Sequence, residues 1–339
     1  MSLVRLQKDA CFVVASAPSE RRAVNLRFLL PVLALIAVAG FAAAYVLGSH
    51  SRGPDVPGPG QDYGVLFVGN SFTYVNDLPG TVEVFLEAGN PAWDDVYNEG
   101  FTHPGERFSG HLARIRSGEL ERLGLGTLDA ASMQTVILQQ QSAISGYPRE
   151  SELGRISAAS AAQLQAHFRQ SGLEVWLLMT WAWRNGWRTR VSGGQTGYLR
   201  MQHDVVAAYE GLAQSTWGDA PRMKVIPAGL AWERVFREDR ARERVLPLRF
   251  EMLYTADGSH PSVAGSYLTA CVVYASLTGD SPVGLPAVYP SLSQEQVDYL
   301  QTVAWQTVED WRIRQGGQSP PAEGASPPSS PASGRLGEP

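Results

Sequence analysis

The stretch that decides the fold is Val65-Leu-Phe-Val-Gly-Asn-Ser-Phe-Thr73, an apolar run that ends at a glycine. The four apolar residues at 65–68 are typical of a buried strand. Gly69 breaks this strand and places Ser71 at a strand-to-helix turn. Because α/β sheets expose side chains at the carboxyl ends of their strands, we expect the Ser71 hydroxyl to lie at such an edge.

A second informative segment, Asp257-Gly-Ser-His-Pro-Ser262, lies almost two hundred residues further along the chain. It places a carboxylate and an imidazole three residues apart on one turn. At this spacing Asp257 can orient His260 while His260 takes a proton from a serine, which is the chemistry of an acyl hydrolase. Each segment also has a plainer interpretation, with Ser71 as a helix cap and 259–261 as the start of a helix.

The region between these two segments alternates short apolar runs with helical patterns. This alternation predicts a largely parallel sheet wrapped by helices, in one domain because the motifs of one site span its whole length. We expect a flavodoxin-like three-layer α/β/α sandwich with a mainly parallel five-stranded sheet. Its predicted strands are 65–68, 94–98, 135–139, 175–179 and 224–227. Its predicted helices are 79–88, 107–116, 150–170, 198–213, 261–277 and 294–314.

Six sequence blocks in a fixed order give the chain a resemblance to a known family. They are Gly69-Asn-Ser-Phe-Thr73, Pro104-Gly-Glu-Arg-Phe-Ser-Gly-His111, Leu138-Gln-Gln-Gln-Ser142, Thr180-Trp181, Pro227-Ala-Gly-Leu-Ala-Trp232 and Asp257-Gly-Ser-His-Pro261. In this respect the chain resembles one branch of the SGNH hydrolases, also called GDSL-like esterases. The resemblance covers residues 63–282 and is strongest at the two ends that hold Ser71 and His260.

The resemblance implies a role for each site residue. Ser71 would attack an ester carbonyl, His260 would act as general base and then acid, and Asp257 would hold the imidazole tautomer. In the family the oxyanion hole consists of the backbone amides of the nucleophile and of a glycine, plus one side-chain amide. Here Ser71 and Gly105 match the two backbone donors. Gly105 could equally be a turn glycine after Pro104.

The third oxyanion donor is where the chain departs from the best-known family pattern. No Gly-x-Asn-Asp follows the central strand, and Leu138-Gln-Gln-Gln-Ser142 stands in its place. A glutamine donates the same kind of N–H as asparagine from a longer arm, so Gln141 or Gln139 could fill the role. We favour Gln141 because it lies nearer the carboxyl end of the strand. Alternatively, these glutamines bond only loop backbone.

Three other residues are candidates for substrate contact. Asn70 precedes the predicted nucleophile, and it either shapes a turn or reaches the substrate. Trp181 and Trp183 follow a predicted strand at its carboxyl end, on the same rim as the site. They could stack on a sugar ring or line an acyl pocket, although such clusters more often form a small core beneath a loop.

The two ends of the chain differ from the predicted domain at 63–314. Residues 28–48 carry no charge and are long enough to span a bilayer as a helix, which predicts a signal anchor. Basic residues in 1–27 predict a cytoplasmic amino terminus and a periplasmic or extracellular domain. A cleaved signal peptide, giving a secreted protein, is the alternative. Residues 49–62 form a Pro/Gly linker, and 315–339 form a Pro/Ser-rich tail that we expect to be disordered.

Composition argues against several other classes of protein. The formal net charge of −5 comes with no basic patch, so we expect no nucleic-acid partner. Cys11 and Cys271 are the only cysteines, and we expect them on opposite sides of the membrane without a disulfide. Neither has metal-ligand spacing, and we expect no metal and no cofactor.

These features together predict a membrane-anchored serine hydrolase that cleaves carboxylic esters through an acyl-enzyme. By analogy with the family, the substrate class to consider first is a small acyl group on a carbohydrate, a glycan or other small-molecule ester. An acyltransferase would use the same triad and pass the acyl group to an acceptor hydroxyl. A non-catalytic binding module is a third reading, against which the intact Ser71, His260 and Asp257 argue.

Overall fold

The computed structural model of the chain describes residues 60–93, 95–125, 133–187, 195–216, 218–241 and 249–316. The predicted segments 1–27 and 28–48, the linker up to residue 59 and the tail from residue 317 lie outside these residues. Their assignments therefore stay predictions. Within the described part of the chain, no helix combines the length and apolar character needed to cross a bilayer.

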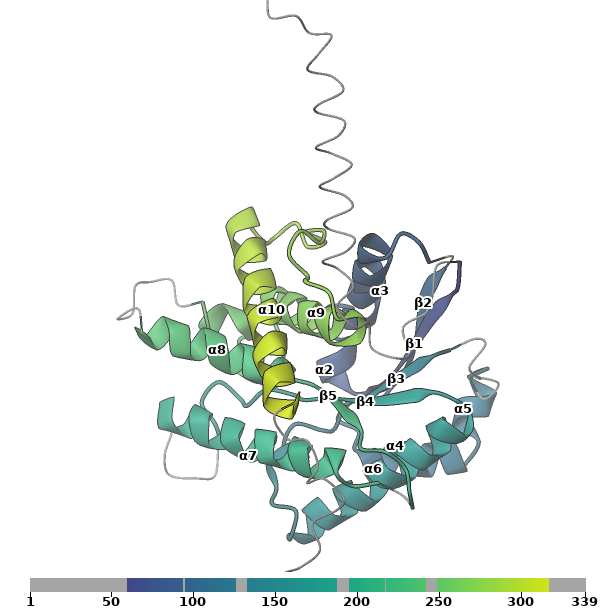
Figure 1. The fold of residues 1–339 in the computed structure, drawn as a ribbon. Coiled ribbons are helices and arrows are strands. Elements are labelled where there is room, and N and C mark those ends of the chain that lie inside the picture. The colour runs from purple at the N-terminus through teal and green to yellow at the C-terminus, as the bar shows by residue number, and fades with distance from the viewer. Residues whose placement is uncertain are drawn as a thin grey trace, which may run out of the picture. The chain divides into compact units, whose positions relative to one another are not determined.

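The centre of the fold is a sheet of five parallel strands in the order β2-β1-β3-β4-β5 (Figure 1). This is the flavodoxin-like order, as predicted. The chain leaves β1 toward one side for β2 and returns past it to β3, so the order reverses between β1 and β3. In such sheets ligands bind beyond the carboxyl ends of the strands at this reversal. The strands are β1 (Tyr63–Gly69), β2 (Val96–Thr102), β3 (Thr135–Leu138), β4 (Glu174–Leu178) and β5 (Lys224–Ile226).

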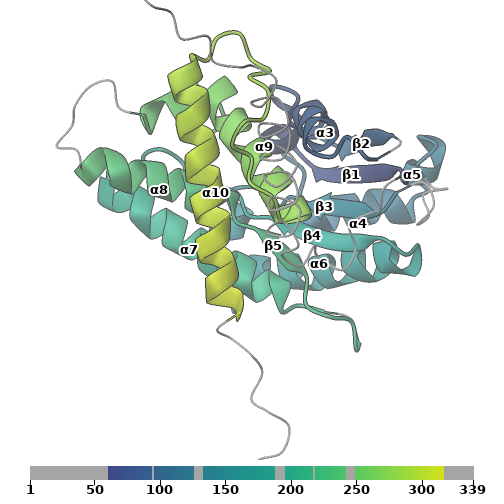
Figure 2. The ribbon, with the colours of Figure 1, turned by 45° about the horizontal axis from the view of Figure 1, so that its top comes forward.

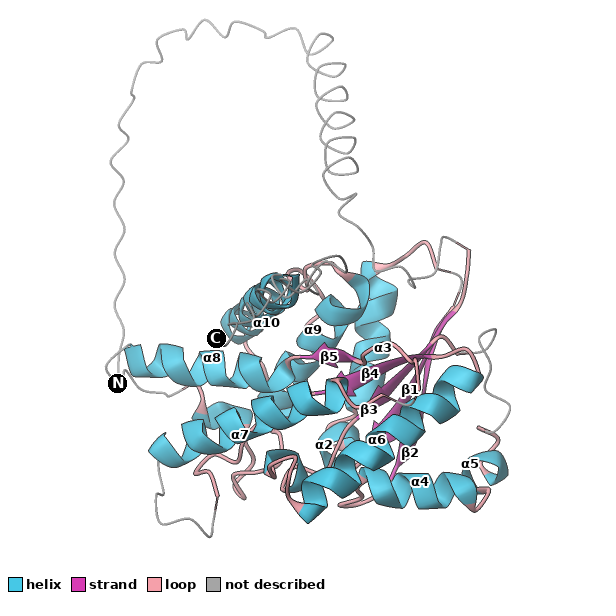
Figure 3. Ribbon diagram, turned by 60° about the horizontal axis from the view of Figure 1, so that its bottom comes forward, coloured by secondary structure: helices cyan, strands magenta, loops and turns pink. Residues whose placement is uncertain are grey.

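Helices cover both faces of the sheet, which gives the predicted three layers (Figures 2 and 3). One layer holds α3 (Leu78–Gly89) and α9 (Val263–Thr278), and the other holds α4 (Phe108–Arg116), α6 (Glu152–Gln170) and α7 (Gln195–Ala213). α10 (Gln294–Gly316) packs on the outer side of α9 and against α8 (Ala228–Ala241).

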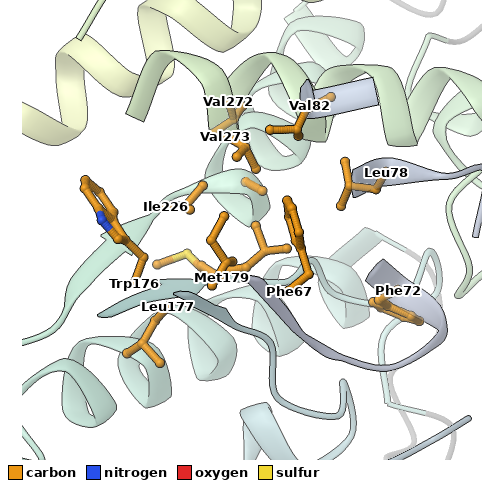
Figure 4. Packing of buried hydrophobic residues seen from close by; sticks show 14 of the residues in the cluster. Phe67, Phe72, Leu78, Val82, Trp176, Leu177, Met179, Ile226, Val272 and Val273 are labelled. Atoms are coloured by element: carbon orange, nitrogen blue, oxygen red, sulfur yellow. The ribbon is translucent and has the colours of Figure 1, made fainter. Parts of the chain in front are cut away.

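The hydrophobic core fills both faces of the sheet, between the strands and the two layers of helices. All seven residues of β1 are buried, as expected for a central strand that is covered on both faces. Figure 4 shows Phe67 and Met179 beneath Val272 and Val273 of α9. α9 itself is buried from Ala264 to Thr278, because α10 covers the side that the sheet does not reach.

Two of the longer elements differ from the sequence-based prediction. β2 spans Val96–Thr102 instead of 94–98, and it carries the exposed residues Glu99 and Gly100 because it lies at the edge of the sheet. The predicted strand ends at residue 98 because Glu99 and Gly100 break the apolar pattern. The later end of β2 brings the following turn level with the end of β1. Helix α8 was not predicted, although its buried residues Trp232, Val235, Phe236 and Asp239 follow helical spacing.

His111 on α4 is a buried histidine that does not belong to the predicted triad. Its side chain is fully buried and packs on the rings of Phe101 and His103, at centroid distances of 5.6 and 5.8 Å. Burial lowers the pKa of the His111 imidazole to about 4, against the opposite effect of the Glu106 carboxylate. The ring is therefore uncharged at neutral pH.

This burial predicts a stability that depends on pH. The folded pKa of His111 lies below the unfolded value of about 6.5, so the unfolded chain binds more protons between these values. Stability is complete above pH 6.5 and falls as the pH drops toward 4, by about 2–3 kcal/mol. Urea unfolding of His111→Gln should show a smaller loss over this range than wild type. His203→Gln, at an exposed histidine, should keep the wild-type loss, and an unchanged loss in His111→Gln would contradict the assignment.

Candidate active site

Ser71 begins a short helix directly after the carboxyl end of β1. Helix α2 spans Ser71–Tyr74, and Asn70 caps it by accepting a hydrogen bond from the backbone N–H of Phe72 at 3.1 Å. The strand can end this tightly because position 69 has no side chain. A Cβ on Gly69 would lie 2.4 Å from the Thr73 hydroxyl oxygen and 2.8 Å from an amide oxygen of Gln139. The Ser71 side chain thus stands half-exposed at the reversal point of the sheet.

Asp257 and His260 lie in one loop between the short helix Glu251–Leu253 and α9. An antiparallel bridge between Tyr254 and Pro261 closes this loop, and the backbone N–H of Thr255 donates to the carbonyl of His260 at 3.0 Å. The bridge fixes both ends of the loop. The imidazole of His260 therefore projects from a rigid loop.

The two segments meet in one hydrogen-bonded chain of side chains. Ser71 Oγ lies 2.8 Å from His260 Nε2, although the residues are 189 positions apart in the sequence. His260 Nδ1 lies 2.5 Å from Asp257 Oδ2. With Nδ1–H donating to the carboxylate, Nε2 is left as an acceptor for the serine proton. This is the geometry that activates a hydroxyl as a nucleophile.

The Asp257 carboxylate is held as an anion by the loop around it. Its Oδ1 accepts hydrogen bonds from the backbone N–H groups of Ser259 at 2.8 Å and His260 at 2.9 Å, and from the Thr255 hydroxyl at 2.9 Å. Burial raises the pKa of Asp257, but the hydrogen bonds, led by that of the His260 ring, outweigh it and hold the pKa well below the usual range. The carboxylate therefore stays charged at neutral pH and accepts the hydrogen bond of the His260 ring.

A stack of aromatic rings joins the nucleophile helix to the histidine loop. The Trp181 ring lies parallel to Phe72 at 4.9 Å and parallel to Trp232 at 4.0 Å, and the edge of His260 meets Phe72 at 5.4 Å. The indole N–H of Trp181 donates to the carbonyl of Ser259 at 3.1 Å. Trp181 therefore positions both partners of the Ser71–His260 hydrogen bond.

A turn that carries Gly105 lies beside Ser71. The backbone N–H of Glu106 donates to the carbonyl of His103 at 3.2 Å, and Gly105 has a φ of 64°, which favours glycine. Two hydrogen bonds tie this turn to the end of β1. The His103 N–H donates to Gly69 at 3.1 Å, and the Asn70 side chain donates to the Glu106 carbonyl at 3.0 Å.

The first of the two candidate glutamines supports the turn that carries Ser71. Gln139 is fully buried, and its side-chain oxygen accepts from the Asn70 backbone N–H at 2.9 Å and from the Thr73 hydroxyl at 3.0 Å. Its side-chain N–H group donates to the carbonyl of Gln140 at 2.5 Å. Both ends of the amide thus have partners within the protein.

The second glutamine is placed at the level of the nucleophile. Val68 pairs with Leu138 across β1 and β3, and Ser71 and Gln141 each lie three residues further along. Gln141 is half-buried, and its side-chain oxygen accepts from the backbone N–H of Ile144 at 3.0 Å. This hydrogen bond fixes the amide oxygen of Gln141 in the loop. The amide N–H groups are the part of the side chain that could donate to a ligand.

Two of the three predicted substrate contacts are corrected by the structure. The exposed fraction is 2% for Asn70 and 0% for Trp181, so neither has surface to offer a substrate. Both side chains connect parts of the fold. Asn70 caps α2 and bonds to the Gly105 turn, and Trp181 is the centre of the ring stack. Trp183 is half-buried, with its indole N–H donating to the Ser142 hydroxyl at 3.2 Å, and stays a candidate contact.

The sequence predicts Asn76 only as a turn residue, but its side chain also connects the Ser71 segment to α9. Its side-chain N–H group donates to the Pro261 carbonyl at 3.1 Å and to the Ser266 hydroxyl at 3.0 Å. Asn76 and Asp77 both have positive φ, at 56° and 52°, which is uncommon outside glycine. An Asn-Asp pair just after a short helix is the sequence signal for such a turn.

The described groups at the site are a hydroxyl, an imidazole, a carboxylate, and backbone and side-chain amides. Over the part of the chain that the structure describes, no group of three His, Cys, Asp or Glu side chains could hold a metal ion. Cys271 is a free, buried cysteine within α9.

Comparisons with known proteins find solved structures of similar fold but no matching sequence family. No family model and no curated protein matches the chain. A DUF4886 family protein from Bacteroides uniformis matches with a TM-score of 0.52 and 17% identity, over 74% of this chain and 95% of its own. A proposed SGNH hydrolase from Slackia heliotrinireducens has a TM-score of 0.48 and 23% identity, over 64% and 100% of the two chains. The acetylxylan esterase Axe2 from Geobacillus stearothermophilus has a TM-score of 0.44 and 15% identity, over 64% and 95%.

These similarities concern the fold. The chain shares its α/β fold with the Bacteroides uniformis protein over nearly all of that protein's length. At this level of identity the chemistry has to be argued from the side chains themselves.

Proposed function

We propose that this chain is a serine hydrolase of the SGNH superfamily that cleaves carboxylic esters through an acyl-enzyme. The observation that carries the proposal is the unbroken hydrogen-bonded chain from Ser71 through His260 to Asp257, at the carboxyl end of β1. The six ordered sequence blocks and the shared fold support it.

The first half of the reaction forms the acyl-enzyme. Ser71 Oγ bonds to the ester carbonyl carbon while its proton passes to His260 Nε2. The carbonyl oxygen becomes an oxyanion, for which the backbone N–H groups of Ser71 and Gly105 and the side-chain amide of Gln141 are the proposed donors. His260 then gives its proton to the leaving alcohol oxygen as the ester bond breaks. The low pKa of Asp257 keeps its carboxylate charged beside the imidazolium.

The second half returns the enzyme to its starting state. A water molecule gives a proton to His260 Nε2 and adds to the acyl carbon, and the same donors hold the second oxyanion. Ser71 Oγ leaves with the proton from His260, and the carboxylic acid is released. A hydroxyl in place of water would make the same site an acyltransferase.

For the substrate, we propose a small acyl group carried on a carbohydrate. Trp183 supports this class because it is half-buried between the two sides of the site. Its indole N–H bonds to Ser142, next to Gln141, while the backbone N–H of Arg184 donates to Gly258 in the histidine loop at 2.8 Å. A fixed indole at such a rim offers an apolar face on which a sugar ring stacks.

The first test is covalent labelling with a fluorophosphonate probe, together with hydrolysis of a short-chain activated ester. Ser71→Ala should remove all labelling and lower kcat by about a thousandfold or more, while the melting temperature stays near wild type. Ser117→Ala, at an exposed serine, should label and turn over normally.

Different outcomes of this test separate the alternative functions. Labelling that persists in Ser71→Ala would place the nucleophile elsewhere. A wild-type protein that does not label would be a binding module. A protein that labels but releases the acyl group only when an alcohol acceptor is added would be an acyltransferase.

A second test separates the two glutamines. Gln141→Ala should lower kcat by about a hundredfold with little change in KM or melting temperature, because the lost donor acts on the oxyanion. Gln139→Ala should instead destabilise the fold by about 1–3 kcal/mol, because two buried donors lose their acceptor. Thermal unfolding and steady-state kinetics measure the two effects. The reverse assignment of effects would move the donor to Gln139.

We also propose that residues 28–48 anchor the protein in a membrane with the catalytic domain outside the cytoplasm. The support is the uncharged length of this segment and the basic residues that precede it. The full-length protein should stay in the membrane fraction after salt and carbonate washes. Recovery in the soluble fraction with a new amino terminus just after the apolar run would show a cleaved signal peptide instead.

A further inference from the structure

A cavity of about 430 Å³ lies beside the edge strand β5, away from the triad. Trp176 of β4, Lys224 of β5, Glu210 near the end of α7, Ser276 of α9 and Trp311 of α10 belong to its lining. It therefore sits where the two helical layers meet around the edge of the sheet. Its volume is within the range of small-molecule sites.

The cavity is separate from the proposed catalytic site. Lys224 is the first residue of β5, so the cavity reaches the amino end of this strand, whereas Ser71 follows the carboxyl end of β1. Two strands, β3 and β4, lie between β1 and β5. No residue of α2 or of the histidine loop lines the cavity.

Two indole rings give the cavity a fixed apolar wall. The side chains of Trp176 and Trp311 are largely buried, and Figure 4 shows Trp176 at the margin of the packed core. The indole N–H of Trp176 donates to Glu174 at 2.9 Å, and Lys224 Nζ lies 4.9 Å from the centre of the Trp176 ring. Lys224 also forms an ion pair with Glu174. These contacts therefore hold the Trp176 ring in place without a ligand.

Ser276 gives the cavity an unused polar group. The exposed fraction of Ser276 is 8%, and its hydroxyl has no hydrogen-bond partner within the described part of the chain. Buried polar groups are nearly always hydrogen-bonded, because an unpaired one loses its water contacts without compensation. A ligand with a polar atom at this wall would supply the missing partner.

The charges around the cavity favour an anion. Arg222, Lys224 and Arg312 line it, against one carboxylate, Glu210. Lys224 is balanced by Glu174, and the carboxylates of Asp280 and Glu309 act on Arg312, which also donates to the carbonyl of Ala275 at 2.8 Å. Arg222 is therefore the lining cation that we expect to meet an anion in the cavity.

We propose that this cavity binds a small ligand with a flat apolar body and one acidic group. The body lies against Trp176 and Trp311, and the acidic group, a carboxylate, sulfonate or phosphate, faces Arg222. A polar atom of the ligand meets the Ser276 hydroxyl. This site does not depend on the esterase activity.

The test is calorimetric titration of the full-length protein with 8-anilinonaphthalene-1-sulfonate, an aromatic sulfonate, in one medium for all variants. Wild type should bind one molecule saturably. Arg222→Gln should weaken binding about tenfold, because it removes a charge-assisted contact. Ser276→Leu should do at least as much by filling the cavity. Arg169→Gln, at an exposed arginine on α6, should bind like wild type.

Two further measurements make the result specific to this cavity. Arg222 is exposed, so its variant should keep the wild-type melting temperature and remains informative if Ser276→Leu does not fold. Binding should also persist after Ser71 has been labelled with a fluorophosphonate. Wild-type affinity in Arg222→Gln, or loss of binding on labelling, would overturn the proposal.

Discussion

The amide of Gln139 is the contact on which the rest of the site depends. Strand β1 ends at Gly69, and the next backbone N–H, that of Asn70, would face the buried end of β3 without a partner. The Gln139 oxygen accepts this N–H and also the Thr73 hydroxyl, so that one buried side chain holds both the end of the strand and the first turn of α2. Because an unpaired buried donor costs free energy, the chain is held to this path.

From this fixed point, three segments that are distant in sequence reach the same place. The Asn70 side chain links this point to the Gly105 turn by a hydrogen bond from its N–H group. Trp181 is linked to the histidine loop by a hydrogen bond from its indole N–H to the Ser259 carbonyl. Each connection is a partly buried hydrogen bond or a ring contact, which restrains both position and orientation. Two side chains that approach within 2.8 Å across 189 residues need such restraints, and the proposed catalysis would be sensitive to small displacements of either one.

The sequence predicted those features that depend on local pattern. The buried run before Gly69 and the spacing from Asp257 to His260 are each set within a few residues of sequence. The structure has the predicted sheet order, and the side chains of Asp257 and His260 are hydrogen-bonded. The misses came from tertiary packing. The burial of Asn70 and Trp181 depends on segments distant in sequence that pack over them. The edge strand β2 is partly exposed, so its residues do not show the apolar pattern of a buried strand.

The turn after the nucleophile helix shows what this arrangement costs. Asn76 and Asp77 occupy the left-handed region, which costs of order 1 kcal/mol or more for each such residue. Glycine would adopt this conformation with less strain, but it would lack the amide that reaches Pro261 and Ser266. Pro261 directly follows His260, so the Asn76 side chain ties the nucleophile segment to the base of the histidine loop. The strain at the turn is therefore offset by a connection that only a side chain provides.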